Sequence, residues 1–195
     1  MHIDKDYEDQ KFEDIKLTEA DIENCRFYDC TFEACTFEEC TLQNCIFSEC
    51  AFYNCNVISL KAVSTQMKHS EFYNCNLIGI RWHELLPAGK IMEPIRKLKE
   101  CFLKYNSFIH MSFRKFDFSG NGIQNSSFDE CRLMESKFQN CRLEATQFSR
   151  CDMRKADFRD AAGYQIDITT NKLKEARFSF PEVVNLLKVL DIKID

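Results

Sequence analysis

Twelve cysteines give this chain its most obvious capacity for chemistry, because thiolates bind metal ions, form disulfides and act as nucleophiles. From Cys25 to Cys55 they recur at every fifth residue, and Cys75 keeps the same spacing. Zinc sites usually bring thiolates together through C-x2-C pairs, which this spacing lacks. Disulfide frameworks are typical of small secreted chains without a sufficient core, whereas the residues between these cysteines supply a full apolar set. We interpret the cysteines as small, free core residues and expect no metal or cofactor, with metal and redox roles as alternatives.

No other residues in the sequence have the spacing of a catalytic site. The histidines His2, His69, His83 and His110 are scattered and have no partner at metal-ligand or triad spacing. The sequence also lacks a glycine-rich phosphate loop and an H-E-x-x-H motif. We therefore do not expect an enzyme.

The cysteine spacing is one part of a five-residue repeat that runs through most of the chain. Two residues after each cysteine stands a large apolar residue; we call the large position i and the small position i−2. Neither an α-helix nor a flat strand repeats every five residues, so the pattern indicates an internal-repeat protein. The predicted large core residues are Phe27, Phe32, Phe37, Leu42, Phe47, Phe52, Phe72, Phe118, Phe128, Phe138, Phe148 and Phe158. The predicted small core residues are Cys25, Cys30, Cys35, Cys40, Cys45, Cys50, Cys55, Cys75, Cys131, Cys141 and Cys151.

A longer period turns the five-residue repeat into a coil. The sequence F-Y-N-C-N occurs at residues 52–56 and again, twenty residues later, at 72–76. Four pentapeptides therefore make one turn of a square-sectioned solenoid, and residues twenty apart stack as parallel strands about 4.8 Å apart. Positions i and i−2 point inward, which leaves the other three positions to carry most of the charged side chains. The sequence thus predicts an all-β fold.

The motif (A/C/S)-x-(F/L)-x-x resembles that of the pentapeptide-repeat family. Residues 25–57 and 126–158 match it closely, and weaker repeats extend the match over most of the chain. The resemblance implies a right-handed quadrilateral β-helix.

One irregular segment interrupts the repeat and shifts its phase by one residue. Pro87, Gly89 and Pro94 punctuate this segment, and apolar residues at helical spacing predict a short helix that starts near Pro94. Three interpretations are open: a tolerated surface insertion, a recognition loop, or a spacer that splits or bends the solenoid. The expected parts of the single domain are N-terminal coils (1–82), an insertion of loop and short helix (83–100), C-terminal coils (101–178) and a C-terminal helix and tail (179–195).

The last segment has the pattern of a helix that covers the end of the solenoid. Ser179 to Glu182 form a capping-box start with proline in the first turn, and an apolar helical pattern follows. Residues 191–194 then alternate like a strand. A solenoid end needs a cover, which is either this segment alone or a second subunit. Family members commonly dimerise through this end, so the resemblance implies a homodimer whose candidate interface residues are Val184, Leu187, Leu190 and Ile192.

Charge is distributed unevenly, and it points to a protein partner. Residues 1–82 hold 15 acidic and 7 basic side chains, whereas residues 98–195 hold 14 and 16. An acidic exterior serves solubility or attracts a basic partner, and the chain has no basic stripe that would bind nucleic acid directly. Tyr53 and Tyr73 are expected to stack outward one coil apart, forming part of an apolar cluster that either makes a contact or is covered by the insertion. The candidate interaction residues are Asp9, Asp14, Glu33, Glu38, Glu39, Glu49, Tyr53 and Tyr73.

Two functions are consistent with these features. The first is a non-enzymatic interaction scaffold with an unidentified protein partner. The second follows from resemblance: residues 164–182 and the interrupting loop look like those of the Qnr- and McbG-like branch. That resemblance implies an acidic, DNA-mimicking dimer that binds DNA gyrase or topoisomerase IV and protects it from quinolones or toxins. The chain has neither the roughly 20-residue apolar run of a membrane helix nor a signal-peptide pattern, so we expect a cytoplasmic protein without membrane contact.

Overall fold

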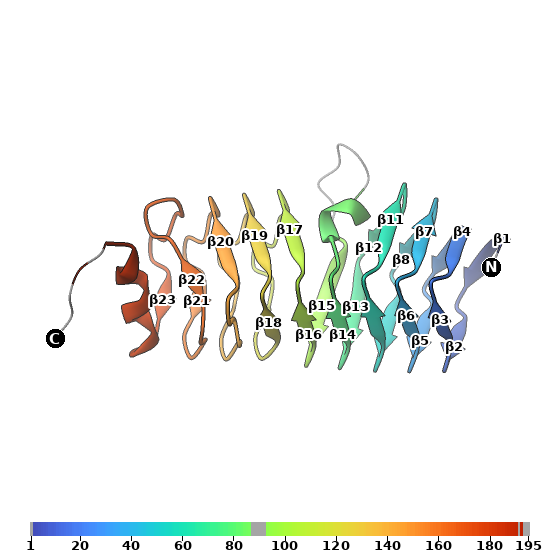
Figure 1. Ribbon diagram of the computed structural model, residues 1–195, viewed down its shortest axis with the longest axis horizontal. Coiled ribbons are helices and arrows are strands. Elements are labelled where there is room, and N and C mark those ends of the chain that lie inside the picture. The colour runs from blue at the N-terminus through green and yellow to red at the C-terminus, as the bar shows by residue number, and fades with distance from the viewer. Residues whose placement is uncertain (1, 87–92, 191, 193–195) are drawn as a thin grey trace.

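The structure, a computed structural model, describes residues 2–86, 93–190 and 192. It is an all-β solenoid in which short strands stack from β1 at one end of a rod to η2 at the other (Figure 1). Four strand-and-corner units make each turn, so residues twenty apart lie in register, as Phe12, Phe32 and Phe52 do. The pairings between these strands are parallel. The predicted square coil is therefore confirmed.

The strands form the flat faces of the coil. One face consists of β2 (Lys11–Glu13), β5 (Thr31–Glu33), β9 (Ala51–Tyr53), β13 (Ser70–Tyr73) and β15 (Ile95–Lys99), and later β21 (Asp157–Phe158) and β23 (Arg177–Phe178). The next face consists of β3 (Lys16–Thr18), β6 (Thr36–Glu38), β10 (Asn56–Ile58), β14 (Asn76–Ile78), β16 (Phe102–Lys104) and β18 (Gly122–Gln124). The other two faces contain β1 (His2–Glu8), β4 (Asp21–Tyr28), β7 (Thr41–Gln43), β8 (Ile46–Ser48), β11 (Lys61–Val63) and β12 (Gln66–Lys68), then β17 (Ser107–Ile109), β19 (Ser127–Asp129), β20 (Gln147–Ser149) and β22 (Gln165–Ile166).

The corners between faces are made by residues in the left-handed backbone conformation. These residues stand two positions after the large core residue; Asp9, Asn54 and Arg150 have φ angles of 50°, 54° and 52°. Outside glycine this conformation costs roughly 1–2 kcal/mol, and Asn and Asp tolerate it best. Each five-residue repeat therefore contains a corner residue that turns the chain as well as an inward side chain.

The core is the continuous column of inward side chains along the axis. The predicted large residues are buried, except Phe37, which is half-buried and packs against the others. Rings twenty residues apart stack face to face, as Phe32 and Phe52 do with centroids 4.8 Å apart. All twelve cysteines are buried, and none of them forms a disulfide.

The prediction of a short helix that starts near Pro94 is wrong. Ile95–Lys99 is strand β15, and Phe72 pairs with Leu98 in it, so the offset between coils rises from twenty residues to 26. Ile95 and Leu98 are buried because they resume the inward column, and not because they form one side of a helix. The helical element of this region is η1 (Trp82–Leu85), one 3-10 turn before the irregular segment. Pro87 and Gly89 lie outside the described residues.

The C-terminal end is covered by a 3-10 helix, η2 (Glu182–Leu190), which packs Leu186 into the core. The coil continues up to Phe178, which stacks on Phe158 with ring centroids 5.3 Å apart. Of the strand expected at 191–194, only Ile192 lies within the described residues, and it has no regular secondary structure.

Candidate functional site

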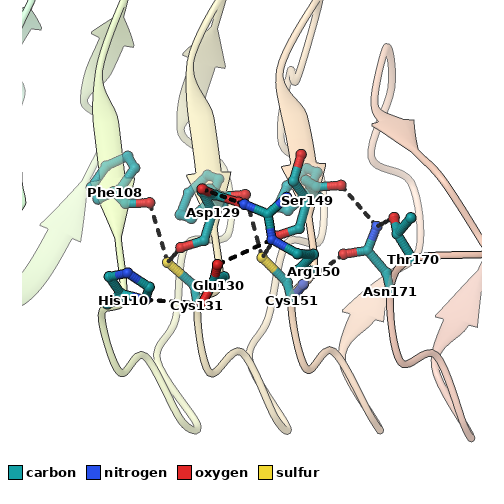
Figure 2. Close-up of polar contacts among 12 residues, drawn as sticks. Phe108, His110, Asp129, Glu130, Cys131, Ser149, Arg150, Cys151, Thr170 and Asn171 are labelled. Atoms are coloured by element: carbon teal, nitrogen blue, oxygen red, sulfur yellow. Dashed lines mark hydrogen bonds and ion pairs between the residues drawn. The ribbon is translucent and has the colours of Figure 1, made fainter.

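The cysteines form a hydrogen-bonded lane inside the coil. The Sγ of Cys131 lies 3.3 Å from the carbonyl oxygen of Phe108, and the Sγ of Cys151 lies 3.4 Å from that of Phe128, at equivalent places on neighbouring coils (Figure 2). Asn171 continues the lane through its Nδ2, 2.8 Å from the oxygen of Phe148. Each of these three side chains thus donates to a carbonyl oxygen 23 residues earlier.

Two thiols of this lane, Cys50 and Cys141, are poor nucleophiles because they are buried. Burial raises the pKa of Cys50 and of Cys141 to about 12, so both remain protonated at neutral pH. Within the described part of the chain, no group of three or more His, Cys, Asp or Glu residues is arranged to hold a metal ion. Inside the coil, the side chains of this lane donate hydrogen bonds that link successive coils.

The outer surface of the N-terminal coils stacks like charges. Asp9 and Asp29 occupy equivalent corners of successive coils, as Glu19 and Glu39 do. Within the described ranges, these four carboxylates make no ion pair. Like charges directly opposite on neighbouring strands are destabilising. This arrangement therefore reduces stability and gives the N-terminal coils a concentrated negative field.

The outer surface of the C-terminal coils alternates charges instead. His110, Glu130 and Arg150 stack at one corner, with Arg150 Nε 3.1 Å from Glu130 Oε1 (Figure 2). At another corner, Lys155 Nζ lies 3.7 Å from Glu175 Oε2. On a neighbouring face, Lys137 Nζ lies 3.7 Å from Asp117 Oδ2. In the C-terminal coils, acidic side chains therefore stack on basic ones and form ion pairs. The two halves of the rod differ in this arrangement of charges as well as in net charge.

The structure brings most of the sequence-predicted interaction residues to one region. Glu33, Tyr53 and Tyr73 lie in register on the outer side of β5, β9 and β13. Asp9 and Glu49 lie at the corner that precedes this face, and Asp14 lies at the corner that follows it. Glu38 belongs to β6 on the neighbouring face, and Glu39 to the corner after it, so these two stand apart from the group.

The two tyrosines stack with ring centroids 4.8 Å apart and an interplanar angle of 8°. The Tyr73 hydroxyl donates to Glu71 Oε2 at 2.5 Å, and this hydrogen bond raises the pKa of Tyr73 to about 12. The Nζ of Lys97, from the first coil after the insertion, lies 5.1 Å from the centre of the Tyr73 ring. The strand β15, and not a helix, thus borders the tyrosine pair.

Sequence reasoning missed a network that joins the coils on both sides of the insertion. Arg96 Nη1 lies 3.1 Å from Glu49 Oε2, and its Nε lies 3.6 Å from Glu71 Oε1. His69 Nδ1 contacts the other oxygen of Glu49 at 2.8 Å. These contacts depend on an irregularity in the pairing of β13 with β15: Ser70 pairs with Ile95 and Glu71 with Lys97, so Arg96 is the extra residue between them.

The candidate dimer residues lie on η2 and just beyond it. Val184 and Leu187 are half-buried, whereas Leu190 and Ile192 are 46 % and 52 % exposed. Phe180, which the sequence analysis did not single out, is 81 % exposed. The helix therefore buries one side in the coil and presents apolar side chains outward.

Comparisons with known proteins agree with this geometry. A family model described as "Pentapeptide repeats (9 copies)" matches residues 12–56, and one described as "Pentapeptide repeat region" matches residues 98–178. A solenoid of stacked five-residue corners with small and large inward residues defines a pentapeptide-repeat protein. The chain belongs to the pentapeptide-repeat family.

Solved structures extend the comparison to the whole chain. QnrB1, a plasmid-mediated fluoroquinolone resistance protein, matches 96 % of this chain and 100 % of its own, with 16 % identity and a TM-score of 0.55. HetL, a pentapeptide repeat protein involved in heterocyst differentiation regulation from the cyanobacterium Nostoc, matches 88 % of this chain and 86 % of its own, with 12 % identity and a TM-score of 0.46. At this identity the likeness to QnrB1 shows the fold. No curated protein sequence matches the chain. No helix in the described residues is long and apolar enough to cross a membrane.

Proposed function

We propose that this chain is a non-enzymatic scaffold that binds a basic protein partner through its N-terminal coils. The observation that carries the proposal is the stacking of like charges in the N-terminal coils, such as Asp9 on Asp29. In the C-terminal coils, by contrast, acidic and basic side chains alternate. Stacked like charges destabilise the folded protein, but their electrostatic potential attracts a partner of opposite charge. We also propose a cytoplasmic location, because twelve cysteines that form no disulfide suit a reducing compartment.

A neutralised variant tests this proposal because stability and binding should change in opposite directions. Asp9→Asn together with Asp29→Asn should raise the melting temperature by relieving repulsion. Partners are identified by cross-linking in cells through a photo-reactive residue at position 53, and their binding is confirmed with purified proteins. The neutralised variant should not bind these partners. The matched control is Asp117→Asn with Glu130→Gln in the C-terminal coils, which removes paired carboxylates and should retain binding. Retained binding by the N-terminal variant would overturn the proposal.

We further propose that a second copy covers the outward side of η2. Leu190, Ile192 and Phe180 are exposed apolar side chains at the end of the rod, where association buries them. Leu190→Glu should then convert a dimer into a monomer in sedimentation. A wild-type monomer at the highest accessible concentration would contradict the proposal.

A second candidate function is binding of a type II topoisomerase. It is favoured by the end-to-end likeness to QnrB1, a fluoroquinolone resistance protein, and by the acidic corners of the N-terminal coils. The charge density argues against it: duplex DNA carries one charge per roughly 1.7 Å of axis, whereas stacked corners here are about 4.8 Å apart. The deciding experiment is DNA supercoiling by gyrase in the presence of ciprofloxacin. Protection or inhibition at micromolar protein would support this function, and the absence of both would exclude it.

A further inference from the structure

The repeated sequence F-Y-N-C-N builds a two-rung ladder on the outside of the rod, which we call the Tyr–Asn ladder: Tyr53 with Tyr73, Asn54 with Asn74, and Asn56 with Asn76. The amide Nδ2 of Asn74 donates to Asn54 Oδ1 at 2.8 Å, and that of Asn76 donates to Asn56 Oδ1 at 2.7 Å. The tyrosine rings lie on the face of β9 and β13, and the asparagines continue around the next corner. Identical side chains therefore follow one another on two successive coils.

The amides of this ladder can bind a peptide backbone. Asn54 and Asn74 are exposed, and the bond between them uses one Nδ2 proton of Asn74 and the Oδ1 of Asn54. An amide side chain offers two donor protons and an acceptor oxygen, which are the groups that a peptide N–H and C=O require. Extended peptides that join a sheet edge are held through hydrogen bonds of their N–H and C=O groups, and pockets for alternate side chains provide selectivity.

The ring of Tyr53 adjoins a negatively charged groove. Tyr53 is 38 % exposed, and Glu33 lies in register with it one coil earlier. A shallow groove of about 440 Å³ extends from Tyr53 over Thr31 to Asp9 and Asp29; its remaining lining is Gln10, Lys11 and Glu33. Lys11 is the basic side chain of the groove, and it pairs with Glu13 and with Glu33 at 2.8 Å. Asp9 and Asp29 remain without an ion pair among the described residues.

The chain itself shows what such a surface binds. At the far side of the tyrosine pair, Lys97 lies over the Tyr73 ring and Arg96 joins Glu49 to Glu71. Tyr53 and Glu33 also place a ring beside a carboxylate, in register on successive coils, and both line the groove. A guanidinium fits this combination better than an ammonium, because it stacks flat on a ring and pairs with a carboxylate through two N–H groups.

We propose that the Tyr–Asn ladder and its groove bind an extended, arginine-containing segment of a protein partner. The guanidinium lies on the Tyr53 ring beside Glu33, and the amides of Asn54 and Asn74 hold the backbone of the segment. This inference rests on the proposed function, because it names the chemistry that the acidic N-terminal coils recognise.

Binding of a fluorescein-labelled arginine–serine repeat peptide, measured by fluorescence anisotropy at low salt, tests the inference. The lysine–serine peptide should bind more weakly, and the glutamate–serine peptide should not bind. Tyr53→Ala should weaken binding of the arginine peptide about fivefold, the effect of one exposed cation–π contact. The matched control is Tyr105→Ala, which removes another exposed tyrosine, beneath Lys104, and should leave binding unchanged. Lys11→Ala, which frees Glu33, should strengthen binding.

The variants separate this inference from the proposed function. If Tyr53→Ala and Asn54→Ala bind the peptide as the wild type does while Glu33→Gln weakens binding, the ladder has no role and acidity alone attracts basic segments. If the wild type binds no basic peptide, both the inference and the proposed function fail. Melting temperatures of all variants exclude loss of folding, since the substituted side chains are outside the core.

Discussion

The thiol of Cys45 lies 3.3 Å from the carbonyl oxygen of Ile22, one coil earlier along the axis. On the opposite side, the backbone N–H of Cys45 donates to Thr65 Oγ1 at 3.1 Å, and that hydroxyl in turn lies 3.0 Å from the oxygen of Leu42. A cysteine at position i−2 therefore fills space and also links successive coils. Thr65 replaces it in this lane because a hydroxyl makes the same bond.

Substitution of Cys45 should show both roles. Cys45→Ala should cost about 1 kcal/mol, because the carbonyl of Ile22 loses a buried donor. Cys45→Ser should retain that bond, whereas Cys45→Asp should unfold the coils because a buried charge there has no counter-ion. Urea unfolding measures all three, and equal stability of the alanine and aspartate variants would contradict the inward placement.

The large position of the same coil should be more sensitive. Phe47 is 6 % exposed and stacks on Phe27 with ring centroids 4.8 Å apart. Phe47→Ala should cost about 3–5 kcal/mol, since it removes a ring from a column that cannot collapse along its axis. Thermal unfolding measures this loss. The control is Phe180→Ala, which removes an 81 % exposed ring and should leave the monomer's stability nearly unchanged.

The five-residue period predicted the fold because it fixes which side chains point inward. It failed at Ile95 and Leu98, where apolar residues three apart fit both a helix and a resumed coil. The contact between Arg96 and Glu49 could not be predicted either, since it depends on a six-residue increase in the coil offset. The Asn54–Asn74 bond, by contrast, follows from the twenty-residue stacking alone.

The left-handed corners offer a stabilising substitution. Ala34 has a φ angle of 52° and stacks at the same corner as Asn54. Ala34→Asn should raise stability by about 1 kcal/mol, because asparagine tolerates this conformation and can extend the amide ladder by one rung. Ala34→Val should instead destabilise, since a β-branched side chain strains the corner. Melting temperatures of the pair give the comparison, and a more stable valine variant would rule out the backbone argument.

Acid should weaken the C-terminal coils through Asp157. Arg159 donates to its carboxylate at 2.6 Å, and this hydrogen bond lowers the pKa of Asp157 below the usual 3.8. A depressed pKa in the folded state stabilises the protein above pH 3.8, and this stabilisation is lost as the pH falls through the lower folded value. Arg177 lies opposite Asp157 on the next coil and acts in the same direction. Asp157→Asn should therefore lower the melting temperature at pH 7 and show a smaller further loss in acid. The control is Asp160→Asn, which removes an exposed corner carboxylate that accepts a hydrogen bond from Ser179. An unaltered acid dependence in Asp157→Asn would show that other carboxylates control it.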